Sequence, residues 1–65
     1  MAESIKFEEV LELFESNGWV LQRIFGNFRV FREPKEDFYW TIPVNDGKVN
    51  YEIGRQVKEY FTEQE

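Results

Sequence analysis

The first clear hydrophobic pattern in the chain is helical. Four apolar residues recur at i, i+3, i+4 and i+7, the spacing of one face of an amphipathic helix; they are Phe7, Val10, Leu11 and Phe14. Asn17-Gly18 follows them, and glycine readily takes the left-handed conformation that ends a helix. We therefore predict a first helix that ends at this dipeptide.

The central stretch from Gly18 to Pro43 has the composition of β-strands. It is rich in Val, Ile, Phe, Tyr, Trp and Thr, which fit a pleated, half-buried surface. Gly26-Asn27 predicts a two-residue hairpin turn, and Pro34 interrupts the stretch a second time. We therefore predict three antiparallel strands, over Trp19–Phe25, Phe28–Arg32 and Phe38–Ile42.

The predicted turn also determines which residues share a face of the sheet. It pairs Phe25 with Phe28, Arg23 with Val30 and Leu21 with Arg32. We assign to the side under the helices Leu21, Val30, Trp40 and Ile42. We assign to the open side Val20, Ile24, Phe31 and Tyr39. An open face is usually polar, so an apolar one indicates a partner surface or a homodimer; a register shift of one residue exchanges the two sets.

The last third of the chain predicts a loop and a second helix. The loop spans Val44 to Val49 and Asn50 is a plausible helix cap. The core stripe of the helix consists of Ile53, Val57, Tyr60 and Phe61. The element order is α-β-β-β-α, in one domain over residues 1–65. This order predicts an α+β two-layer sandwich, with a three-stranded antiparallel sheet and two helices on one face.

Composition narrows the chemistry that such a domain can perform. The 65 residues include no cysteine and no histidine, so thiolate chemistry and the commonest metal ligand are both missing. We expect no metal, no cofactor and no catalytic residue. We find no signal peptide and no apolar run that could span a bilayer, so we expect a soluble, cytoplasmic protein.

Charge is distributed unevenly around a net value of −5. The first helix carries four glutamates, Glu8, Glu9, Glu12 and Glu15, whereas the first hairpin and the turn after it carry Arg23, Arg29, Arg32 and Lys35. Two interpretations remain open. These basic residues are either ordinary solvated side chains or a local basic strip that meets an anionic partner such as RNA.

The central stretch resembles the HicA family, the small toxins of the HicAB toxin–antitoxin systems. The matching positions are Gly18-Trp19, Leu21, Arg23, Gly26, Val30-Phe31, Pro34 and Trp40-Thr41-Ile42-Pro43, without gaps. The resemblance covers residues 5–61, although the second helix matches only in its apolar rhythm. It implies a fold like that of double-stranded-RNA-binding domains, a HicB-like antitoxin as partner and ribonuclease activity on messenger RNA.

One departure from this family bears directly on activity. Phe28 stands where the HicA resemblance implies a catalytic histidine, and phenylalanine cannot transfer a proton. General acid–base catalysis contributes about 10²–10⁴-fold, so its loss removes most of the activity. We therefore expect a non-catalytic module that binds a protein, with four candidate contacts: Ile24, Phe28, Phe31 and Tyr39. The alternative for Phe28 is packing of the hairpin, which is the more frequent role of an aromatic residue at such a position.

Two alternatives remain. A ribonuclease that works by another route would use Arg23, Arg29 and Tyr39 around a phosphate. An RNA-binding protein that does not cleave would use the basic residues of the hairpin, although double-stranded RNA demands more of them than this chain has there.

Overall fold

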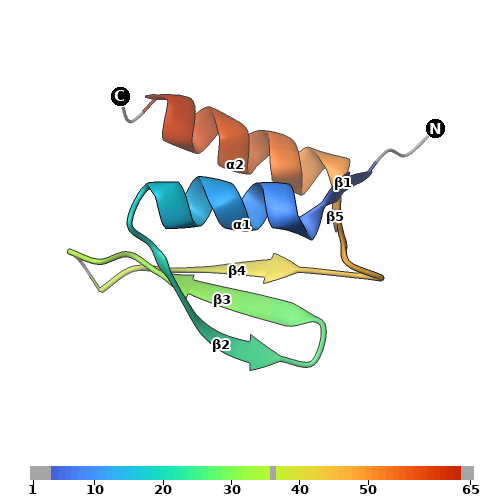
Figure 1. Ribbon diagram of the computed structural model, residues 1–65, viewed down its shortest axis with the longest axis horizontal. Helices are drawn as coiled ribbons and strands as arrows, with labels where there is room; N and C mark the ends of the chain where they lie inside the picture. The colour runs from blue at the N-terminus through green and yellow to red at the C-terminus, as the bar shows by residue number, and fades with distance from the viewer. Residues whose placement is uncertain (1–3, 36, 64–65) are drawn as a thin grey trace.

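The structure, a computed structural model, describes residues 4–35 and 37–63 and contains two helices and two small sheets (Figure 1). The elements are β1 (Ser4–Lys6), α1 (Phe7–Ser16), β2 (Val20–Phe25), β3 (Phe28–Arg32), β4 (Tyr39–Pro43), β5 (Lys48–Asn50) and α2 (Tyr51–Glu63). The predicted framework of two helices and a three-stranded antiparallel sheet in the order β2-β3-β4 is confirmed. Two short strands, β1 and β5, were not predicted and form a separate antiparallel pair.

The β2–β3 hairpin has the predicted register close to its turn. Gly26 has a φ of 59°, whereas Asn27 has no positive φ, as in a type II′ turn. Phe25 pairs with Phe28, and Arg23 with Val30. Further from the turn the register shifts between Leu21 and Arg23, so that Leu21 pairs with Phe31 instead of Arg32. This β-bulge interrupts the regular alternation from which the predicted faces were assigned.

The bulge and the pairing of β3 with β4 correct three assignments. Phe31 pairs with both Leu21 and Trp40, and the Phe31 side chain is 0% exposed. The prediction that Phe31 lies on the open face is therefore wrong, as is the prediction that Val30 lies under the helices. Ile24, also assigned to the open face, pairs with Arg29 and lies on the helix side. Arg23 pairs with Val30 as predicted, but the bulge places Leu21 and Arg23 on opposite faces of the sheet. Leu21 lies on the helix side, so Arg23 and Val30 lie on the open side.

Phe14 of α1 lies at the centre of the core. Its ring stacks on that of Phe31 with centroids 4.0 Å apart and an interplanar angle of 4°. Edge-on contacts join the same ring to Trp19, Trp40 and Phe61, at 5.1, 5.5 and 5.1 Å. The fully buried aliphatic residues around them include Val10, Ile42, Val49 and Val57. Both helices therefore pack on one face of the sheet, and they do so over β3 and β4.

The β1–β5 pair attaches the start of α1 to the start of α2. Phe7 N–H donates to Gly47 O at 2.9 Å, and Asn50 Oδ1 accepts from Glu52 N–H at 2.8 Å, which confirms the predicted cap. Gly54 of α2 lies against Ile5 of β1: a Cβ at Gly54 would overlap Ile5 Cδ1 and lie 3.0 Å from Ile5 Cγ1. Within the described ranges, neither helix has the length and apolar character needed to cross a membrane.

Candidate functional site: the outer face of the sheet

The side of the β2-β3-β4 sheet opposite the helices carries three of the five exposed aromatic residues of the described chain. Strand pairing and alternation place on it Val20, Arg23, Phe25, Phe28, Val30, Arg32, Tyr39, Thr41 and Pro43, which we call the outer face. Helices α1 and α2 lie on the other side of the sheet (Figure 1). The outer face is thus open over all three strands.

Phe25 and Phe28 form the most prominent apolar pair on the outer face. They flank the type II′ turn directly opposite one another and are 67% and 44% exposed. Both line a shallow hollow of about 280 Å³, together with Val30, Thr41 and Arg23. An apolar hollow with one cationic rim residue suits an apolar side chain that has an anionic neighbour.

The charge on the outer face is positive. Arg23 and Arg32 both lie there, and neither forms an ion pair within the described residues. The ion pairs of this part of the chain belong to Arg55 of α2, whose guanidinium bonds Glu52 and Glu59 at 3.1 and 2.8 Å. Those hydrogen bonds, first the one to Glu52, raise the pKa of Arg55 above its ordinary value. As far as the described residues go, the two arginines of the outer face therefore remain available to a ligand.

The structure separates the four residues predicted to contact a partner. Phe28 and Tyr39 lie on the outer face, each 44% exposed. Ile24 pairs with Arg29 and therefore points to the helix side, where it is 61% exposed. Phe31 is buried beneath Phe14 and has no surface to offer.

The four basic residues of the predicted strip do not form one strip. Arg23 and Arg32 share the outer face, but Arg29 points to the other side. Its guanidinium lies 5.6 Å from the centre of the Phe7 ring, and its Nη1 donates to Gly26 O at 3.3 Å. Lys35 lies after β3 and lines a separate hollow of about 180 Å³ beside Trp19 and Tyr60. Of the two interpretations of these basic residues, the arrangement therefore favours separate solvated side chains over one strip of four.

Three residues of the hollow, Phe25, Val30 and Thr41, were not predicted as site residues. The turn signal Gly26-Asn27 did pair Phe25 with Phe28, so both could have been placed on one surface. Val30 was assigned to the covered side together with Leu21, because the bulge beside Gln22 that separates their faces has no signature in the sequence. The one-residue bulge is therefore the reason that the sequence did not predict Val30 as part of the hollow.

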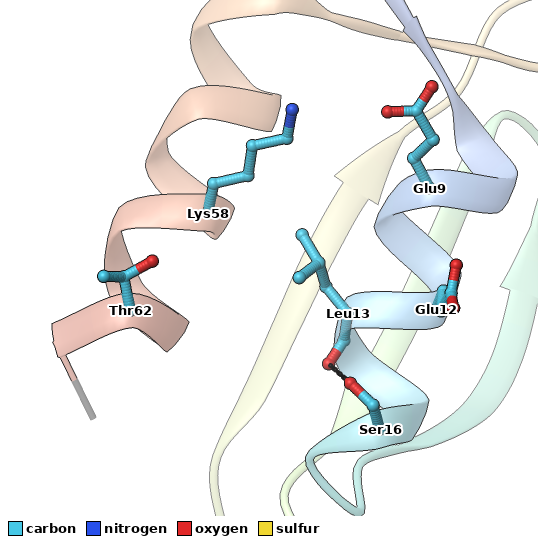
Figure 2. A pocket seen from close by; sticks show the side chains of 6 residues that line it. All are labelled: Glu9, Glu12, Leu13, Ser16, Lys58 and Thr62. Carbon is cyan, nitrogen blue, oxygen red and sulfur yellow. Dashed lines mark hydrogen bonds between the residues drawn. The ribbon is translucent and has the colours of Figure 1, made fainter. Parts of the chain in front are cut away.

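A second depression lies between the two helices (Figure 2). It has a volume of about 450 Å³ and is lined by Glu9, Glu12, Leu13, Ser16, Lys58 and Thr62. Lys58 reaches from α2 toward the side of α1 that carries Glu9, and Ser16 Oγ donates to Leu13 O at 3.1 Å (Figure 2). Its walls are mainly exposed polar side chains of opposite charge, whose hydrogen-bonding groups solvent can reach. The outer face is therefore the better candidate.

The described part of the chain gives little support for a metal site or for a catalytic site at Phe28. No group of three or more acidic side chains comes together there as ligands for a metal ion. Phe28, at the position where the HicA resemblance implies a histidine, lies on the outer face among Phe25, Val30 and Arg23. Comparisons with models of protein families, with curated proteins and with solved structures found no match to this chain.

Proposed function

We propose that this chain is a HicA-like, non-catalytic binding module that holds a protein partner on the outer face of its sheet. The observation that carries the proposal is the exposed Phe25–Phe28 pair beside the hollow of about 280 Å³. Exposed aromatic rings that cluster around a concavity on a small domain are typical of interaction sites. The partner is a HicB-like antitoxin or another cytoplasmic protein.

The side chains around the hollow describe the chemistry of that partner. The ring faces of Phe25 and Phe28 favour an apolar anchor, and buried aromatic anchors supply much of the energy of protein interfaces. Arg23 and Arg32 favour carboxylates at the rim, since guanidinium binds them in bidentate geometry. We therefore expect a partner segment in which an apolar side chain is flanked by Asp or Glu.

A catalytic role fits the outer face poorly. Efficient proton transfer at neutral pH needs a group whose pKa lies near that pH. The phenyl ring of Phe28 cannot titrate, and the chain has no histidine. The ribonuclease hypothesis also drew on Arg29, which lies on the other side of the sheet against Phe7. Arg23 and Tyr39 alone would bind a phosphate group of RNA but would not cleave the RNA chain.

RNA binding without cleavage is the second candidate, and one observation favours it. Two arginines lie among three exposed aromatic rings, Phe25, Phe28 and Tyr39, on one sheet face. Such a face can stack unpaired bases, and each base–aromatic stack contributes about 1–3 kcal/mol. The net charge of −5 opposes it, because phosphate neutralisation dominates nucleic-acid affinity. Protein binding is therefore the preferred proposal.

Site-specific photocrosslinking in the cells that make the protein tests the proposal. A benzophenone analogue of phenylalanine replaces Phe25, Phe28 or Tyr51. Tyr51 at the start of α2 is 45% exposed, closely matching Phe28, but it lies outside the outer face. We expect the same discrete protein adduct from positions 25 and 28, none from position 51, and a loss of yield when Arg23→Glu is added.

Two results would overturn protein binding at this face. One is equal labelling from all three positions, which indicates random collision. The other is an adduct that ribonuclease digestion removes, which transfers the proposal to RNA. A direct titration then separates the nucleic-acid forms: an unpaired RNA oligomer at low salt should bind the wild-type chain and lose most of its affinity with Phe28→Ala.

A further inference from the structure

The free edge of β2 is the second unusual surface of this chain. In the described part of the chain β2 pairs with β3 on one side and has no strand on the other. It lies at the side of the sheet farthest from the helices (Figure 1). Among the described residues, the three most exposed large apolar ones all belong to it: Val20, Ile24 and Phe25 are 56%, 61% and 67% exposed.

The hairpin register determines which backbone groups of β2 are unpaired. Phe25 and Phe28 flank a two-residue turn, so they form a hydrogen-bonded pair. Hydrogen-bonded and non-hydrogen-bonded pairs alternate along an antiparallel ladder, so Ile24 and Arg29 form a non-hydrogen-bonded pair. The N–H and C=O of Ile24 therefore point away from β3, toward the free edge.

Little in β2 protects this edge from another strand. Natural edge strands are commonly blunted by proline, lysine or a bulge. β2 contains no proline and no lysine, and its bulge lies between Leu21 and Arg23. The segment from Arg23 to Phe25 is therefore regular and open. Ile24 and Phe25 are apolar on its two faces, and Arg23 carries its one charge.

We propose that two copies of this chain pair antiparallel through β2, with the two-fold axis at Ile24. In this register the two Ile24 side chains face each other, and Arg23 of each copy lies opposite Phe25 of the other. That arrangement places no like charges directly opposite and sets each guanidinium beside an aromatic ring. A register centred on Arg23 would oppose two guanidiniums and would need backbone groups that already bond Val30.

The dimer would join the two sheets into one of six strands. The outer faces of both copies would then be continuous, with the two Phe25–Phe28 pairs beside the shared edge. A partner could contact both copies at once, which raises its apparent affinity. The proposed pairing does not depend on the proposed function, because it uses the edge of β2 rather than the outer face.

Sedimentation of the full chain from micromolar to millimolar concentration tests the pairing. We expect the mass to rise from that of the 7.9 kDa chain toward twice that value. Ile24→Lys places two ammonium groups opposite each other and should weaken the dimer about tenfold or more. The matched control is Tyr51→Lys, which adds the same charge at another exposed apolar site and should dimerise as the wild type does.

Two further measurements keep the test decisive. Ile24→Pro removes only the outward N–H, which an edge strand tolerates, and it should abolish the dimer while circular dichroism stays unchanged. In the wild type, hydrogen exchange at the Ile24 amide should slow as concentration rises. A monomer at every concentration, an Ile24→Lys variant that dimerises normally, or an Ile24 amide insensitive to concentration would overturn the proposal; each result leaves crosslinking at Phe28 unaffected.

Discussion

The contact between Gly54 and Ile5 allows a sharp test of how the β1–β5 pair attaches to α2. Alanine is more favourable than glycine in a helix interior by about 0.8–1.0 kcal/mol, so Gly54→Ala would stabilise an isolated helix. In the folded chain the new Cβ would overlap Ile5 Cδ1 and press on Ile5 Cγ1. Isoleucine is stiff at χ1, so rotation about χ2 can move Cδ1 but leaves Cγ1 3.0 Å from the new Cβ.

The magnitude follows from these two opposing terms. Overpacking costs about 1–3 kcal/mol, which exceeds the gain in helix propensity, so Gly54→Ala should destabilise the wild type by up to about 2 kcal/mol. Ile5→Val removes Cδ1, and a shift of a few tenths of an ångström relieves the remaining contact. In that background Gly54→Ala should stabilise the chain by up to about 1 kcal/mol, a coupling of about 1–3 kcal/mol between the two sites.

Urea unfolding measures this coupling, with the fluorescence of Trp19 and Trp40 as the signal. Both tryptophans contact the aromatic core and report global unfolding. The four chains of the cycle should share one m-value, which shows that they unfold from equally compact states. Gln56→Ala, at an exposed position of the same helix, is the control and should change stability by less than about 0.5 kcal/mol. If Gly54→Ala stabilises both backgrounds equally, Ile5 does not lie against α2 and the reasoning is wrong.

Two further predictions use the same unfolding assay. Phe31→Ala should cost about 3–5 kcal/mol because the ring is fully buried, whereas Phe28→Ala, three residues earlier on the same strand, should cost less than about 1 kcal/mol; equal losses would contradict the assignment of faces. Asn50→Ala should cost about 1 kcal/mol through loss of the bond to Glu52 N–H, whereas Asn50→Asp should retain most of the stability; an unchanged unfolding midpoint in Asn50→Ala would show that Asn50 does not cap α2.

Long, strongly periodic segments could be predicted from the sequence for physical reasons. Phe7, Val10, Leu11 and Phe14 recur at helical spacing, and Val10 and Phe14 are fully buried in the structure. The turn at Gly26-Asn27 was predicted from its glycine and sets the pairs nearest to it. These features depend on neighbouring residues alone, so they can be inferred without knowledge of the rest of the fold.

The missed features depend on residues that are distant in the sequence. β1 and β5 have three residues each and are strands because Ile5 pairs with Val49, 44 positions later in the chain (49 − 5). One local signal for β5 was present: Asp46 and Gly47 both take positive φ, as in a type I′ hairpin turn, and Asn45 bridges Lys48. The bulge at Leu21 and Arg23 has no such signal, since it arises where the sheet must present Leu21 and Phe31 to the core together.

The packed face and the outer face of the sheet contribute differently to stability. Stability is concentrated on the helix side of the sheet, where Phe14 stacks on Phe31, whereas Phe25 and Phe28 on the outer face bury little. Substitutions on the outer face should therefore alter binding without unfolding the domain, because the two faces share strands but not packing partners. This separation makes the proposal testable in a chain of 65 residues, in which a single core substitution can consume most of the folding free energy. A loss of partner adduct in a folded Phe28→Ala variant would then be a property of the face itself.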